Sequence, residues 1–142
     1  MEEDIKVKLL FERLYPYFFM CMAFYFWSLL NISLPKNDSL LSSTLGVSGV
    51  LVGFLATSKA ILIAMNSKII DDLRSSGYML FLVSYIGQAI WINLTFCTIN
   101  VIGFFQDHTQ PWYSGIWIVL AVGSLLSFMR VADTMLAIFR HH

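Results

Sequence analysis

The chain has 142 residues, of which 58% are hydrophobic and 13% are charged. An ordinary soluble domain carries about 25% charged residues, so this composition argues against a soluble globular domain and predicts a polytopic membrane protein. Lysine plus arginine number 9 and aspartate plus glutamate number 9, so no net charge is available to attract nucleic acid. Direct nucleic-acid binding is therefore not expected.

Four apolar segments are long enough to cross a bilayer. A spanning helix needs about 20 mostly apolar residues, because the hydrocarbon core is roughly 30 Å thick and an α-helix rises about 1.5 Å per residue. The segments cover residues 15–34, 41–65, 78–105 and 112–139, and short turn-rich connections join them. The predicted fold is all-α: one four-helix transmembrane domain over residues 1–142, with four transmembrane helices and cytoplasmic helical extensions.

The basic residues near the ends of these segments are unevenly divided between the two sides of the predicted bundle. One side carries only Lys36. The other carries Lys6, Lys8, Arg13, Lys68, Arg74 and Arg140. Because loops rich in Lys and Arg stay in the cytoplasm, both termini and the middle connection are expected there. The expected location is the bacterial inner membrane, with the chain crossing it several times.

Beyond the membrane the helices are expected to continue. Counting about 20 residues from the outer end of the second and fourth segments places Lys59 and Arg130 near the inner boundary. Past Lys59, apolar residues recur at helical spacing among charged ones: Ile61, Met65, Ile69 and Leu73. Similar runs precede the first segment and end the fourth, so the helices should rise about 10–15 Å into the cytoplasm. The predicted partner-binding residues are Lys68, Asp71, Asp72 and Arg74.

Small residues gather on one face of the second segment: Gly46, Gly49, Gly53 and Thr57. Lipid provides no hydrophobic drive for helix association, so small residues that let backbones approach closely mark packing faces. Two interpretations stay open. The face could join copies of the chain, or it could pack within the same bundle, which we favour because such glycine patterns are common.

Two basic residues lie within apparent spans. Lys59 and Arg130 would each cost at least about 2.5–3.5 kcal/mol at the bilayer centre, so a gate, an anion site or a lipid-headgroup site is one interpretation. The favoured alternative is that each side chain extends to the inner interface. Asp133 follows Arg130 by three residues, so the two are expected to pair on one helical face. All three are predicted to be membrane-interface charges.

The third segment is the most polar. Ser84, Gln88, Trp91 and Thr95 form one stripe at helical spacing, and Asn93, Cys97 and Asn100 form another. The predicted pore or polar-stripe residues are Ser84, Gln88, Asn93 and Asn100. They could line a water-filled pore, but hydrogen bonding to neighbouring helices is the favoured interpretation. With polar groups on two faces, this helix is expected to be central.

Motifs for chemistry are absent from the sequence. No Gly-rich phosphate loop, Ser–His–Asp set or paired carboxylates occur, and the two cysteines alone make no metal site. No catalytic, cofactor-binding or metal-binding residue is predicted, and an enzyme is not expected. No carboxylate lies deep within a span, which argues against a proton-coupled transporter.

The small-residue tract 40–53, the charged turn 66–74 and the arrangement of four spans resemble the membrane subunit of the Kiwa anti-phage defence system. No functional residue is carried over by identity. The resemblance implies a homo-oligomeric membrane sensor, a tetramer being one candidate assembly. It also implies that the sensor holds a cytoplasmic, DNA-binding partner subunit and responds to phage at the envelope.

Two functions from different classes follow. The leading hypothesis is a non-enzymatic oligomeric membrane scaffold or sensor, which contacts membrane lipid and anchors a cytoplasmic effector, with a role in antiviral defence. The protruding amphipathic runs motivate it. The alternative is a pore-forming or holin-like protein that permeabilises the membrane, motivated by the polar third segment together with Lys59 and Arg130.

Overall fold

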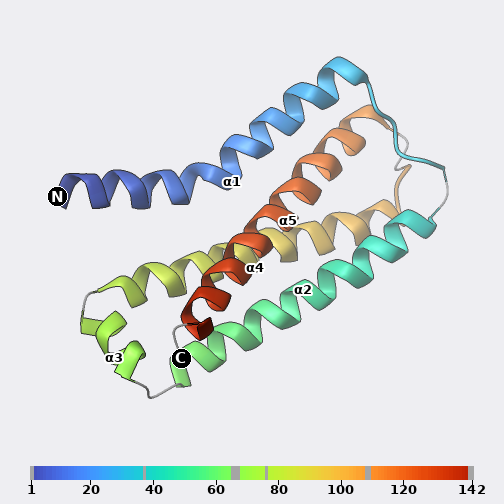
Figure 1. Cartoon of the computed structure of the whole chain (residues 1–142). Helices are drawn as coiled ribbons and strands as arrows, with labels where there is room; N and C mark the ends of the chain where they lie inside the picture. The colour runs from blue at the N-terminus through green and yellow to red at the C-terminus, as the bar shows by residue number, and fades with distance from the viewer. Residues whose placement is uncertain (1, 37, 65–67, 76, 108–109, 141–142) are drawn as a thin grey trace.

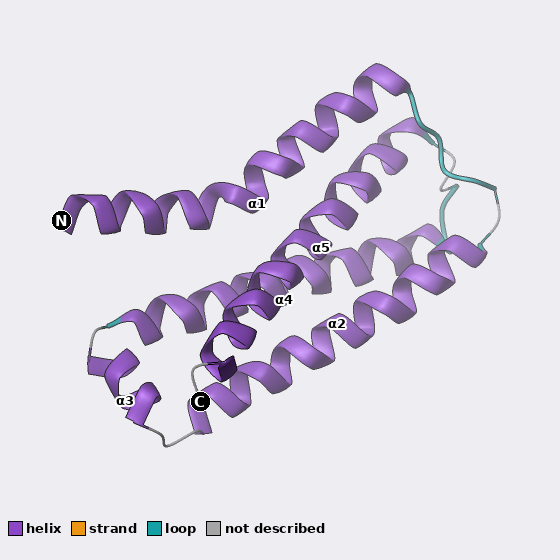
Figure 2. Cartoon of the chain, viewed as in Figure 1, coloured by secondary structure: helices purple, strands orange, loops and turns teal. Residues whose placement is uncertain are grey.

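The computed structural model describes the chain apart from residues 1, 37, 65–67, 76, 108–109 and 141–142, and it describes the backbone alone for residues 2–13, 68–69, 72–73, 78 and 139. All regular structure in the described part is helical (Figures 1 and 2). Its helices are α1 (Glu2–Leu30), α2 (Ser39–Ala64), α3 (Lys68–Ser75), α4 (Tyr78–Gly103) and α5 (Pro111–Arg140).

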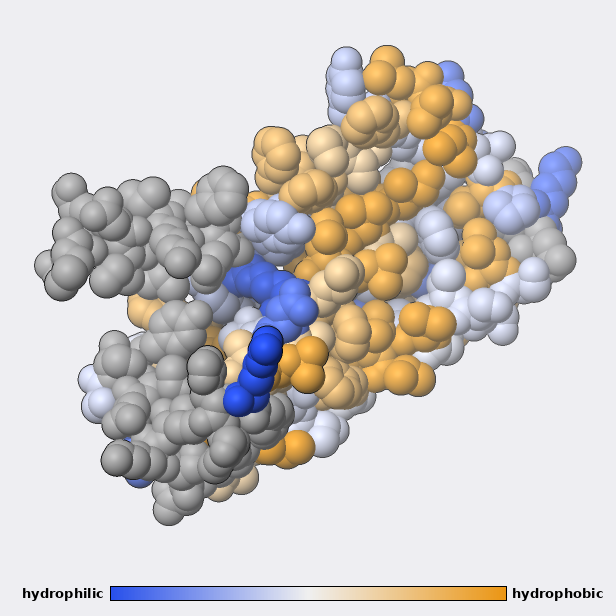
Figure 3. Space-filling view, viewed as in Figure 1, coloured by the Kyte–Doolittle hydropathy of each residue, from blue (hydrophilic) through white to orange (hydrophobic). Residues whose placement is uncertain are grey.

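Three helical segments are long and apolar enough to cross a membrane: Ser39–Ala64, Met79–Gly103 and Pro111–Ile138. The apolar part of α1, Leu14–Leu30, is shorter than these three. In Figure 3, apolar side chains form a band across the middle of the visible face, and hydrophilic ones gather toward its ends. The predicted all-helical membrane class is confirmed, and three of the four expected spans reach spanning length.

The first helix ends earlier than the sequence predicted. It stops at Leu30 rather than at residue 34, and Asn31 follows with φ at 46°. This left-handed conformation is one that asparagine tolerates better than most residues, and it ends the helical hydrogen-bond pattern. Leu34 is nevertheless buried, because it packs with Leu41 and Tyr113 in a small apolar cluster at this end of the molecule.

The long helices are arranged as an open row rather than a closed ring of four. α4 packs against α2 on one side and α5 on the other, and α1 packs mainly against α5. Figure 1 shows α1 and α2 on opposite sides of α5 and α4. α4 and α5 are therefore the two inner helices of the row.

The second helix and the segment that follows it do not form one straight rod. α2 ends at Ala64, and α3 is a separate short helix that packs against the start of α4 (Figure 1). Ile70 of α3 is fully buried in the main apolar cluster, where it joins Leu62 of α2 and Leu82 of α4. Gly77, with φ at 72°, lets the chain turn into α4 in a conformation that favours glycine. The expected continuation of the second segment as one helix was wrong, because Ile70 of α3 packs in the main apolar cluster with side chains of α2 and α4 instead.

The first helix bends along its length. Figure 1 shows its N-terminal part running away from the other helices, while its C-terminal part follows α5. Pro16 lies inside this helix and is buried. Proline removes one backbone hydrogen bond and crowds the preceding turn, which kinks a helix. The kink separates an N-terminal arm, residues 2–14, from the part of α1 that packs on α5.

Candidate functional site

The polar interior of the bundle is organised by one asparagine. Asn100 is fully buried on α4, and its Oδ1 accepts hydrogen bonds from Thr44 Oγ1 of α2 at 2.7 Å and from Trp117 Nε1 of α5 at 3.0 Å. Its Nδ2 donates to the carbonyl of Phe96 at 2.8 Å. One side chain thus joins three helices, at about 0.6 kcal/mol for each interhelical bond and up to roughly 1.7.

A second buried asparagine, Asn93, lies two helical turns before Asn100 on α4 and bonds to α5. Ser124 Oγ of α5 donates to Asn93 Oδ1 at 2.5 Å, and both side chains are almost fully buried. Between the two asparagines, Cys97 Sγ of α4 lies 3.0 Å from Ser48 Oγ of α2. The stripe of Asn93, Cys97 and Asn100 therefore faces inward, where hydrogen bonds between helices satisfy its polar atoms.

The other predicted stripe of α4 faces outward. Ser84 and Thr95 are exposed and Gln88 is half-buried. Trp91, on the same stripe, is 71% exposed. Thr95 Oγ1 donates a hydrogen bond to the carbonyl of Trp91 in its own helix, at 2.9 Å. Ser84 and Gln88 therefore do not share one conduit with Asn93 and Asn100 within a single chain.

A cavity of about 180 Å³ lies between α2, α4 and α5. Thr44, Ser48 and Ser124 contribute to its wall, but their hydroxyls already take part in the hydrogen bonds described above. Phe96 and Leu125 line the rest together with other apolar side chains. A cavity with so few available polar partners favours an apolar occupant over ordered water.

The glycine face of α2 does not pack inside the chain. Gly46, Gly49 and Gly53 are exposed, and nothing lies within 4 Å of a Cβ placed on any of them. Thr57 is also exposed, and its hydroxyl donates to the carbonyl of Gly53 at 2.8 Å. The favoured interpretation, packing within the bundle, was wrong. The interface between copies stays a prediction.

Close helix approach occurs instead at glycines that the sequence did not single out. A Cβ on Gly115 of α5 would lie 3.1 Å from the Trp27 ring, and one on Gly123 would lie 2.7 Å from Met20 Sδ, both on α1. Trp27 Nε1 also donates to Ser114 Oγ at 3.1 Å. The available signal was the eight-residue spacing of the two glycines, which places them on one helical face.

The tightest glycine lies at the end of α4. A Cβ on Gly103 would overlap the Tyr113 hydroxyl and would lie 2.9 Å from Leu41 Cδ1. The Tyr113 hydroxyl donates to the carbonyl of Ile99 at 2.7 Å, which fixes the start of α5 against the end of α4. Neither residue was a candidate in the sequence, because an isolated glycine near a helix end usually marks only a cap.

The two basic residues within the spans lie against different parts of α4. The guanidinium carbon of Arg130 lies 3.8 Å from the centre of the Tyr85 ring, a cation–π contact. Lys59 Nζ lies 3.7 Å from the position that a Cβ on Gly87 would take. The expected ion pair between Arg130 and Asp133 is absent from the described residues, since Asp133 is exposed and the Tyr85 ring accepts the guanidinium instead.

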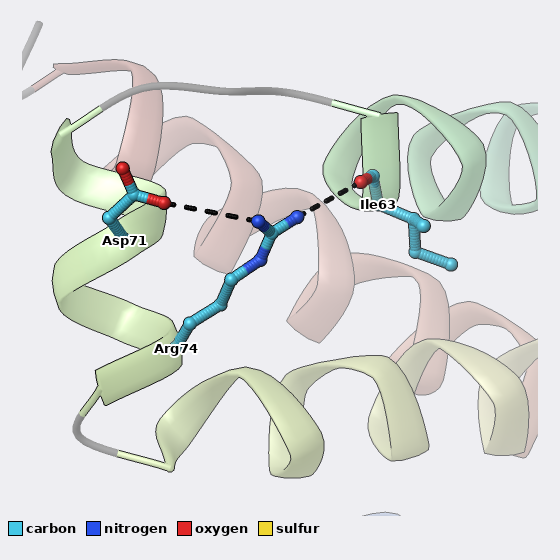
Figure 4. Close-up of polar contacts among 3 residues, drawn as sticks. All are labelled: Ile63, Asp71 and Arg74. Carbon is cyan, nitrogen blue, oxygen red and sulfur yellow. Dashed lines mark hydrogen bonds and ion pairs between the residues drawn. The ribbon is translucent and has the colours of Figure 1, made fainter.

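Two of the predicted partner-binding residues contact their own chain. Arg74 Nη2 donates to the carbonyl of Ile63 at 3.2 Å, and Arg74 Nη1 lies 3.9 Å from Asp71 Oδ1 (Figure 4). Ile63 is in the last turn of α2, where carbonyls lack helical partners and a cation is favourable. Asp71 remains largely exposed. The side chains of Lys68 and Asp72 lie outside the described part of the structure.

The comparisons with known proteins found no relative of this chain. No family model, curated protein or solved structure matches the chain. Among the described residues, no group of three His, Cys, Asp or Glu side chains could hold a metal ion. The candidate site is therefore defined by geometry: a hydrogen-bonded core, an outward glycine face on α2, and the end of the molecule that carries α3.

Proposed function

We propose that the chain is a non-enzymatic, oligomeric membrane scaffold or sensor that anchors a cytoplasmic effector protein. All four long helices cross the bacterial inner membrane, and both termini and α3 lie in the cytoplasm. The apolar part of α1, Leu14–Leu30, has 17 residues, which is at the short end of the range of about 17–25 that crosses a bilayer. The resemblance to the Kiwa membrane subunit makes a DNA-binding defence effector the first partner to test.

The hydrogen bonding of Asn100 is the observation that favours a scaffold over a pore. Its side chain links α2, α4 and α5 while being fully buried. Such a core favours a fixed bundle, because opening a water path through it would break bonds on three helices at once. The outward glycine face and the charged α3 end are the surfaces left for association.

Oligomer formation is tested through the glycine face. Gly49→Leu should shift the chain from an oligomer to a monomer in native membranes, as measured by chemical crosslinking and native electrophoresis. Val50→Leu is the matched control, since Val50 is the adjacent residue and is 71% exposed. An unchanged oligomer in Gly49→Leu would remove this face from the proposal.

Partner binding is tested through α3. Asp71→Ala should reduce the amount of effector that is recovered with the chain from native membranes. Asp71 is preferred to Arg74, because changing Arg74 also disturbs the contact with Ile63. Lys36→Ala, at the opposite end of the bundle, is the control. Equal recovery with both variants would show that α3 is not the binding surface.

A second candidate is a pore between several copies, favoured by the outward position of Ser84 and Gln88 on α4. Ion flux through purified protein in liposomes separates the two functions. A scaffold leaves the liposomes sealed. A pore conducts, and Gln88→Leu then reduces the conductance, whereas Thr98→Val should not change it, because the Thr98 hydroxyl bonds to its own helix.

A further inference from the structure

Three polar side chains that have no partner among the described residues belong to neighbouring parts of α2 and α4. We define the Lys59 cluster as Lys59 of α2 with Ser84 and Gln88 of α4. The Lys59 ammonium lies beside Gly87, and Ser84 and Gln88 belong to the helical turn that carries Gly87. Within the described residues, none of the three side chains takes part in a hydrogen bond or an ion pair.

Several other polar side chains in these two helices bond within the chain. Thr57, Thr95 and Thr98 are exposed, and each bonds to a carbonyl of its own helix. Asn93 and Asn100 are buried and bond across helices. Lys59, Ser84 and Gln88 follow neither pattern, so their donors are available to a group outside the chain.

The depth of Lys59 identifies the chemistry that can meet it. α2 has 26 residues and is about 39 Å long, roughly 9 Å more than the hydrocarbon core. Lys59 precedes the end of α2 by five residues, or about 7.5 Å. If α2 protrudes equally on both sides, Lys59 lies about 3 Å inside the boundary, and its side chain is within reach of phospholipid phosphates.

Gly87 makes this position available. A Cβ at residue 87 would touch the Lys59 ammonium at an ordinary contact distance of 3.7 Å, so a larger side chain would occupy the space of the ammonium. The absence of a side chain at Gly87 therefore leaves room for the Lys59 ammonium against the turn of α4 that carries Ser84 and Gln88. A cation with neighbouring neutral donors is a suitable set for a phosphate group.

We infer that the Lys59 cluster binds a phosphate group, with Lys59 supplying the charge and Gln88 and Ser84 supplying hydrogen bonds. A phospholipid headgroup of the adjacent leaflet and free inorganic phosphate share this chemistry. The experiment is native mass spectrometry of the full chain in detergent, titrated with phosphatidylglycerol or phosphatidylcholine. Phosphatidylglycerol should remain bound, and Lys59→Gln should weaken it about fivefold, as expected for one cation near anionic lipid.

Matched variants separate the site from general lipid attraction. Lys36→Gln removes a charge from the opposite end and should leave binding unchanged. Gly87→Leu should weaken binding with all charges kept, whereas Gly87→Ala should not. Circular dichroism establishes that each variant is folded. Equal retention of phosphatidylglycerol by Lys59→Gln and Lys36→Gln would overturn the inference.

A competition arm identifies the source of the phosphate. Excess inorganic phosphate should leave the bound phosphatidylglycerol in place if the site selects a lipid headgroup. Displacement of the lipid by inorganic phosphate would support the phosphate site and assign it to the soluble anion. Retention of phosphatidylcholine equal to that of phosphatidylglycerol in every variant would contradict a role for the Lys59 charge.

Discussion

The helices of this protein are joined in two different ways. α2, α4 and α5 are joined by buried side-chain hydrogen bonds that centre on Asn100 and Asn93. α1 contacts α5 mainly through large side chains packed on glycines, with Trp27 on Gly115 and Met20 on Gly123, besides one hydrogen bond from Trp27 Nε1 to Ser114 Oγ. Since lipid is as apolar as the side chains it surrounds, hydrogen bonds and close packing are the available ways to associate helices. In this molecule hydrogen bonds predominate among α2, α4 and α5, and close packing predominates between α1 and α5.

The largest predicted effect is at the contact between α1 and α5. Gly115→Leu should destabilise the fold by about 3 kcal/mol, because the new side chain would occupy the position of the Trp27 ring. Equilibrium unfolding in mixed micelles measures the loss. Spin labels on Cys21 and on Met129→Cys, in a Cys97→Ser background, should move apart. An unchanged distance would show that α1 does not depend on these glycines.

The hydrogen-bonded region gives the next largest effect. Asn100→Leu should destabilise the fold by about 2 kcal/mol, because it removes the acceptor for Thr44 and Trp117. The same unfolding measurement applies, and the distance between the α1 and α5 labels should stay constant. Thr98→Val is the control, since Thr98 is exposed and bonds within α4. A loss equal to that of the control would contradict the joining role of Asn100.

The smallest predicted effect is an increase in the stability of the monomer. Gly53→Ala should stabilise the detergent-solubilised monomer by about 0.5–1 kcal/mol, because alanine favours a helix and nothing lies within 4 Å of the added Cβ. The comparison with Gly115→Leu then separates glycines that contact a helix of the same chain from those that do not. If Gly53→Ala destabilised the monomer, the glycine face of α2 would have to contact another part of the same chain, which would contradict this prediction.

Helix positions and the membrane class could be predicted from the sequence, because apolar length and helical spacing are local properties. The limits of α2, α4 and α5 lie within two residues of the expected ones, whereas α1 ends four residues early at Leu30 and α3 was not expected as a separate helix. The helical spacing of Ile61, Met65, Ile69 and Leu73 predicted a continuous helix, because spacing alone does not show where a helix breaks. Burial of Ile70 between α2 and α4 decided for the break.

The candidate site was likewise predicted in part from the sequence and decided in part by the tertiary structure. Helical periodicity separated the stripe with Asn93 and Asn100 from the stripe with Ser84 and Gln88, because positions three and four residues apart share a face. Which stripe faces the neighbouring helices depends on where α2 and α5 lie, and only the tertiary structure fixes that. The same holds for the glycines of α2 and α5: a sequence shows where a backbone can be approached closely, and the packed structure decides which helix approaches it.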